Sequence, residues 1–242
     1  MTEPILPADL SKILAPAAWL AVVTCVATVL LLVALHVLSP EFDPSFRMVS
    51  EYALGHYAWV LSLMFLSWGI SSWALVLAIR SQIVTTAGKV GLVFLVMAGL
   101  GEAMASWFDV RHEVGHGIAG ILGVFGFPVG AVLLTVALRR TGCWQSVGKA
   151  LLWIANLSWI CVVLLFGSLV LMTMQMIRAN GGHLPQHAPK SLPPGVLGID
   201  GWADRLLVFT FCAWVFVVAL QAIRLRRVPA DTLHGTLPSL LP

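Results

Sequence analysis

Charged side chains are scarce in this sequence. Its 242 residues include 14 Lys and Arg and 11 Asp and Glu, or 10% charged residues, whereas 59% are hydrophobic. A soluble domain carries about a quarter charged residues, so a soluble core is not expected. Disorder is excluded because it requires low hydrophobicity and high charge. The net charge of +3 is small, and we expect no nucleic-acid partner.

Cysteine and tyrosine are also rare. No C-x-x-C occurs among the four Cys residues, which excludes a zinc ribbon and a thioredoxin-like redox pair. Cys25, Cys161 and Cys212 lie in apolar runs, where a thiol behaves as a small hydrophobe. The chain has ten Trp but only two Tyr, and Trp is typical of chains anchored at membrane interfaces.

The sequence instead contains apolar runs long enough to cross a bilayer, which takes about 20 residues. We expect membrane helices at residues 17–38, 57–79, 90–108, 117–138, 150–177 and 202–223, the last of them apolar over 206–223. The first run is too long for a signal-peptide core and lacks a cleavage site, so it is interpreted as a retained helix. These features predict an all-α, six-transmembrane-helix bundle over 17–223, with a cytoplasmic N-terminal segment at 1–16 and a cytoplasmic basic tail at 224–242.

The distribution of Lys and Arg predicts the orientation of this bundle. If both termini are cytoplasmic, nine of the 14 basic residues lie inside: Lys12, Arg80, Lys89, Arg139, Arg140, Lys149, Arg224, Arg226 and Arg227. Every inner connection is then short and basic, as the positive-inside rule requires. We therefore expect a multi-pass protein of the cell (inner, cytoplasmic) membrane that has membrane lipid as a partner.

One carboxylate lies inside a predicted span. Glu102 stands six positions before the outer end of the third run, and an ionised carboxylate facing lipid there would cost several kcal/mol. We expect Glu102 to face the bundle interior. It then serves either a functional site or a hydrogen bond to a neighbouring helix.

The densest group of ionisable residues precedes the fourth span. It contains H-E-x-x-H, in which His112 and His116 can bind zinc while Glu113 acts as a general base. A catalytic zinc normally has three protein ligands, and the candidates that complete this set on the outer face are Asp109, Asp200, Glu51 and His56. The alternative is a polar helix start with hydrogen-bonded histidines.

Glycines recur through the fourth span at positions 117, 120, 123, 126 and 130. Small residues let neighbouring membrane helices approach closely, so we interpret them as packing positions. Pro128 is expected to bend the same helix.

Three segments carry a family resemblance. They are Val49 to Gly55 followed by Trp59, then Asp109 followed by His116 and Gly117, and finally Gly201 to Leu206 running into an apolar helix and a terminal Arg cluster. In order and placement they resemble the prokaryotic six-helix membrane proteins grouped as domain-of-unknown-function family 998. The resemblance implies a six-helix bundle with a polar outer pocket that involves Ser50, Glu51, Asp109, His116 and Arg205. It implies no activity. The chain departs from the family in its short connection between Asp109 and His116, which creates the H-E-x-x-H.

Two functional hypotheses follow. The first is a metal-dependent membrane hydrolase or lipid-modifying enzyme, acting on a lipid or an amphiphilic small molecule in a pocket that opens to the extracytoplasmic side. Its pocket residues are Ser50, Glu51, Glu102, Asp109, His116 and Arg205, its catalytic candidates are Glu113, Glu51 and Asp109, and its metal candidates are His112, His116, Asp109 and Asp200. Ser, Asp and His near a membrane face also resemble the metal-dependent hydrolases that include alkaline ceramidases. The second hypothesis is a non-catalytic lipid-binding, transport or sensing protein.

Two weaker interpretations remain. A haem-bearing electron carrier can use His36 with His116 as an axial pair. A site-two-type intramembrane protease can combine the H-E-x-x-H with Asp200 and Gly201. The first lacks a second histidine pair near the inner face, and in the second the motif sits at the outer end of its span.

The orientation can be tested with reporter fusions. Fusions after Arg140 and after Arg227 are expected to report the cytoplasm, and a fusion after Lys190 the outside, because the basic loops remain on the cytoplasmic side. A cytoplasmic signal from the Lys190 fusion would contradict this orientation.

Overall fold

The computed structural model describes residues 12–183 and 191–227. Within these ranges the chain forms helices and no strands, and six helices are long and apolar enough to cross a membrane, which confirms the predicted six-helix bundle. The helices are α1 (Ala15–Leu38), α2 (Ala58–Ile79), α3 (Thr86–Ala105), α4 (Glu113–Gly120), α5 (Gly126–Arg139), α6 (Gln145–Ala179) and α7 (Asp200–Arg226). Short helical turns are η2 (Val49–Leu54), η3 (Arg80–Gln82), η4 (Ile121–Phe125) and η5 (Gly142–Trp144). Lys190, most of the N-terminal segment and most of the basic tail lie outside the described residues.

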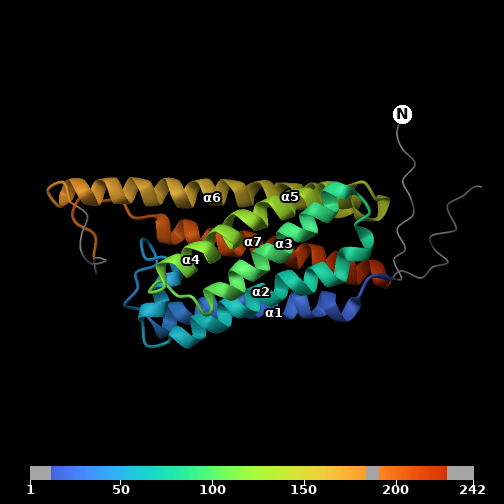
Figure 1. Cartoon of the computed structure of the whole chain (residues 1–242), viewed down its shortest axis with the longest axis horizontal. Helices are drawn as coiled ribbons and strands as arrows, with labels where there is room; N and C mark the ends of the chain where they lie inside the picture. The colour runs from blue at the N-terminus through green and yellow to red at the C-terminus, as the bar shows by residue number, and fades with distance from the viewer. Residues whose placement is uncertain (1–11, 184–190, 228–242) are drawn as a thin grey trace, which may run out of the picture.

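The spans pack as a closed ring in chain order. α1 packs against α2, α2 against α3, α3 against α5, α5 against α6, α6 against α7, and α7 against α1. Figure 1 shows α6 along one edge of the bundle and α1 along the opposite edge, with α7 between them. α7 is accordingly the most buried span and α6 the least.

Aromatic packing joins α5 to α7 in the middle of the bundle. The rings of Phe127 and Phe211 stack with centroids 4.0 Å apart, and Trp214 meets Phe127 edge-on. The Trp214 indole N–H donates to Thr135 Oγ1 over 3.0 Å. Because hydrocarbon offers no partner for a polar group, this buried N–H must be satisfied within the protein.

The fourth span is a composite of α4, η4 and α5. Its middle part, η4, is a π-helix, a rare form that occurs mostly as a single turn inside α-helices. Pro128 lies three residues into α5 and has no N–H to donate to the carbonyl of Val124, four residues earlier. The sequence predicted a bend at Pro128. The irregular turn that the structure contains is η4, which ends immediately before α5 and packs against α3.

The glycines of this span divide into two groups. A Cβ added at Gly130 would lie 3.1 Å from a backbone oxygen of α3, as expected for a packing position. On the α3 side, a Cβ added at Gly101 would lie 2.5 Å from the carbonyl oxygen of Ala119. At Gly117 and Gly120, in contrast, an added Cβ meets nothing within 4 Å. These two positions border open space instead of a packed helix.

The close approach of α3 to the fourth span predicts that Gly101→Ala destabilises the protein. The added methyl group collides with backbone atoms that cannot rotate away, so we expect the free energy of unfolding to fall by about 1–3 kcal/mol, as in other overpacked cores. Gly167→Ala on α6, where a Cβ meets nothing within 4 Å, is the matched control. Equal unfolding temperatures of the two variants in detergent would contradict the close packing of Gly101 against the fourth span.

Candidate functional site

A pocket of about 530 Å³ lies between α4 and α6, with walls from α2, α3, η4 and α7 and a rim from η2. α4 packs against α3, whereas α6 packs against α5 and α7. The pocket occupies the space that separates α4 from α6. Its walls are mostly aliphatic and aromatic. The volume falls in the range of small-molecule sites, roughly 300–1,000 Å³.

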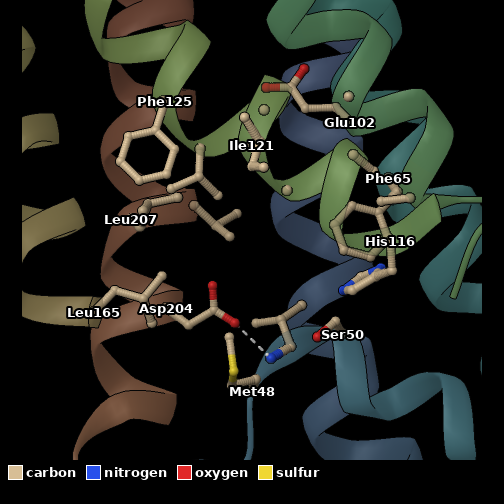
Figure 2. Close-up of a pocket in the computed structure, with 18 of the residues that line it drawn as sticks. Met48, Ser50, Phe65, Glu102, His116, Ile121, Phe125, Leu165, Asp204 and Leu207 are labelled. Carbon is tan, nitrogen blue, oxygen red and sulfur yellow. Dashed lines mark hydrogen bonds between the residues drawn. The ribbon is translucent and has the colours of Figure 1, made fainter. Parts of the chain in front are cut away.

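Ionisable groups reach this apolar pocket from three helices. Glu102 comes from α3, His116 from α4 and Asp204 from α7, and Ser50 adds a hydroxyl at the rim. Figure 2 shows Glu102 and Asp204 on opposite walls of the pocket, with His116 on a third side. No Lys or Arg lines the pocket in the described part of the chain.

Glu102 faces the bundle interior, as the cost of exposing it to lipid requires. Its side chain is only 4% exposed, and Oε2 accepts a hydrogen bond from the Ser72 hydroxyl of α2 over 2.8 Å. Oε1 has no hydrogen-bond partner among the described residues. Glu102 therefore joins α3 to α2 through Oε2, while Oε1 lacks a donor. An unsatisfied buried acceptor of this kind costs about 1–3 kcal/mol.

His116 is held in a defined tautomer by the loop before α4. Its Nδ1 lies 2.9 Å from the carbonyl oxygen of Phe108. Because a carbonyl oxygen only accepts, Nδ1 carries the hydrogen, and Nε2 of the neutral ring is an acceptor. His116 therefore offers an acceptor to the pocket.

Asp204 is the pocket residue that the sequence predictions missed. It accepts a hydrogen bond from the backbone N–H of Val49 over 2.8 Å, shown as the dashed line in Figure 2, and so joins η2 to α7. A signal for it was present, because Asp204 shares one helix face, at spacings of three, four and seven residues, with the pocket-lining residues Leu207, Val208 and Phe211.

Arg205, predicted for the pocket, lies on a different face of α7 and is only 2% exposed. Its Nε donates to His36 Nε2 over 2.7 Å. Nη1 donates to the carbonyl oxygens of Arg47 and Gly201, each over 2.8 Å, and Nη2 donates to the Tyr52 hydroxyl over 3.0 Å. Arg205 thus ties together α1, α7, η2 and the turn before η2.

The same contacts bear on the haem interpretation. His36 Nδ1 lies 2.7 Å from the carbonyl oxygen of Leu32 and so carries the hydrogen, while Nε2 accepts from Arg205. Both ring nitrogens are engaged within the protein. His36 is therefore not placed to ligate haem together with His116.

Glu51 does not line the pocket but belongs to a local turn. Its Oε2 accepts from the Met48 N–H over 2.8 Å and pairs with Arg47 Nε over 3.1 Å. Burial raises the pKa of the Glu51 carboxyl, although Arg47 and the Met48 N–H act in the opposite direction.

Asp109 likewise serves the loop between α3 and α4. Its Oδ1 accepts from the Arg111 N–H over 2.9 Å. Desolvation raises the pKa of Asp109, but the N–H and guanidinium of Arg111, together with His112, outweigh it, so the net shift is downward.

The predicted zinc ligands are not brought together. His112 is the residue before α4 and has non-helical backbone angles (φ −101°, ψ 67°), so it does not share a helix face with His116 as the H-E-x-x-H mechanism requires. Its side chain is 61% exposed and lies 3.3 Å from Asp109. Asp200 is buried at the start of α7, while Glu113 and His56 are exposed. The described residues contain no group of three His, Cys, Asp or Glu side chains that could hold a metal ion.

Comparison with known proteins gives one match. A family model described as "Protein of unknown function (DUF998)" matches residues 20–221. The match runs from α1 into α7 and includes every residue that lines the pocket. No curated protein and no solved structure matches the chain.

The contacts of Arg205 predict that Arg205→Lys destabilises the protein even though the charge is retained. An ammonium group cannot replace the fixed fork of guanidinium donors, and leaving buried acceptors unsatisfied costs about 1–3 kcal/mol each. We expect a loss of at least about 2 kcal/mol in the free energy of unfolding. Arg178→Lys, at an exposed position of α6, is the control, and similar unfolding temperatures for the two variants would contradict the role of Arg205.

Proposed function

The chain belongs to the DUF998 family of proteins of unknown function, and we propose that it is a membrane protein that binds a lipid-like amphiphile in the pocket between α4 and α6. One observation carries the proposal: a pocket of about 530 Å³ with apolar walls holds three ionisable groups within the span region. Apolar walls favour a hydrocarbon chain. Ionisable groups at this depth favour a polar head group over lipid tails.

We propose that the ligand enters the pocket laterally from the lipid phase of the bilayer. Ile121 lines the pocket and is 63% exposed, and Phe125 and Phe166, which stack on each other with centroids 5.3 Å apart, are also exposed. On a membrane-spanning helix such side chains face lipid. A ligand that already lies in the bilayer can therefore reach the pocket without crossing water.

We place the pocket toward the outer half of the membrane. Its polar residues come from the end of α3, the start of α4, the start of α7 and the connection between α1 and α2. The basic residues Arg80, Lys89 and Arg139 lie at the opposite ends of their helices. With these residues cytoplasmic, both termini are cytoplasmic, the pocket faces the extracytoplasmic side, and the cell membrane is the proposed location.

Binding is preferred to metal-dependent hydrolysis because the catalytic candidates Glu51, Asp109 and Glu113 lie outside the pocket lining. A lipid-modifying enzyme is the second candidate. It is favoured by Ser50, His116 and Asp204 lining one pocket, since a hydroxyl, an imidazole and a carboxyl are the components of a nucleophilic site. Turnover of a bound lipid by the purified protein, abolished by Ser50→Ala, would support this candidate over binding alone.

The binding proposal predicts that Gly120→Trp expels a co-purifying lipid. Gly120 lines the pocket and has open space at its Cβ, so an indole there fills the cavity without displacing a helix. We expect native mass spectrometry to show at least about tenfold less retained lipid, equivalent to about 1.4 kcal/mol.

Gly167→Trp is the matched control, because Gly167 has the same open space but lies on α6 outside the pocket lining. It is expected to retain lipid as the unchanged protein does. Equal retention by both variants would contradict the proposed site.

A further inference from the structure

We propose that the ligand of this pocket is a cationic amphiphile, a molecule with a long apolar chain and a protonated amino group. The proposal rests on the proposed function of the pocket in binding a lipid-like molecule. It adds the charge and the hydrogen-bonding character of the head group.

The ionisable groups that line the pocket present hydrogen-bond acceptors. Glu102 is only 4% exposed, and its Oε1 has no partner among the described residues. His116 uses Nδ1 to donate to Phe108, which leaves Nε2 as an acceptor in the neutral ring. Asp204 uses one carboxyl oxygen for the Val49 N–H. A ligand that brings hydrogen-bond donors satisfies these acceptors.

Arg205 follows Asp204 in α7, but its hydrogen bonds go to neither of the two pocket carboxyl groups. Arg205 directs its donors at His36, Tyr52 and backbone carbonyl oxygens, and no Lys or Arg lines the pocket in the described residues. A phosphate or carboxylate head group would face the carboxyl groups of Glu102 and Asp204 with no Lys or Arg beside it in the described pocket lining. The pocket therefore disfavours an anionic amphiphile.

A protonated amine suits this pocket better than a neutral hydroxyl. An ammonium group carries three donors and no acceptor, whereas a hydroxyl donates only one hydrogen. Hydrogen bonds between ionised partners are also stronger than neutral ones. The apolar walls, which include Leu165, Leu207 and Phe125, accommodate the chain.

The test compares a long-chain alkyl amine, the alcohol and the fatty acid of equal chain length. Each is titrated into the purified protein in nanodiscs of zwitterionic phosphatidylcholine, and binding to protein-free nanodiscs is subtracted. We expect the amine to bind at least about tenfold more tightly than either of the others, the ratio that a charge-assisted hydrogen bond supplies.

The double variant Glu102→Gln with Asp204→Asn replaces both ionisable carboxyl groups with amides and keeps an oxygen to accept from the Ser72 hydroxyl and the Val49 N–H. It is expected to bring the ratio of amine to alcohol affinity close to one while alcohol binding persists. The comparison of the three head groups on the unchanged protein decides the proposal even if this variant fails to fold.

The outcomes separate this inference from the function on which it rests. Equal binding of the three head groups, or preference for the acid, overturns the cationic ligand while binding in the pocket stands. The proposed function fails if none of the three compounds binds above the level of protein-free nanodiscs. It also fails if all three bind to Gly120→Trp as tightly as to the unchanged protein. In either case the cationic ligand fails with it.

Discussion

The hydrogen bonds of the buried Arg205 guanidinium are the interactions on which the pocket end of this bundle depends. A buried charge must be satisfied by hydrogen bonds, and Arg205 finds acceptors on α1, α7, η2 and the turn before η2. The preceding residue, Asp204, accepts the N–H of Val49 from the same segment. One turn of α7 therefore holds the connection between α1 and α2 against the bundle, and this connection forms the rim of the pocket.

The fold could be predicted from the sequence because hydrocarbon imposes strict requirements on length and polarity. The six apolar runs predicted the six spans, whereas the π-helical turn η4 before Pro128 was not predicted. The role of the glycines was predicted in part. Gly130 packs against α3, whereas Gly117 and Gly120 border the pocket, and a pattern of small residues alone does not distinguish a helix contact from an open cavity.

The site was less predictable than the fold, because it depends on which side chains of each helix face the pocket. The interior position of Glu102 followed from the cost of exposing it to lipid. The zinc ligands expected from the H-E-x-x-H are not brought together in the described residues, because His112 precedes the first helical residue of α4. A one-residue difference in a helix start cannot be read from a sequence pattern. Asp204 was missed although its spacing to Leu207 and Phe211 marks the pocket face of α7.

The central claim is that the pocket between α4 and α6 takes up a molecule from the bilayer. Photolabelling with a long-chain probe that carries a photoreactive group in its chain, followed by peptide mass spectrometry, tests it most directly. Labels are predicted to concentrate on pocket residues such as Ile121, Phe125 and Leu169, and a labelled pocket should be protected by excess unlabelled lipid. Labelling spread evenly over the exposed apolar residues of α1, such as Val23 and Leu30, would contradict the claim.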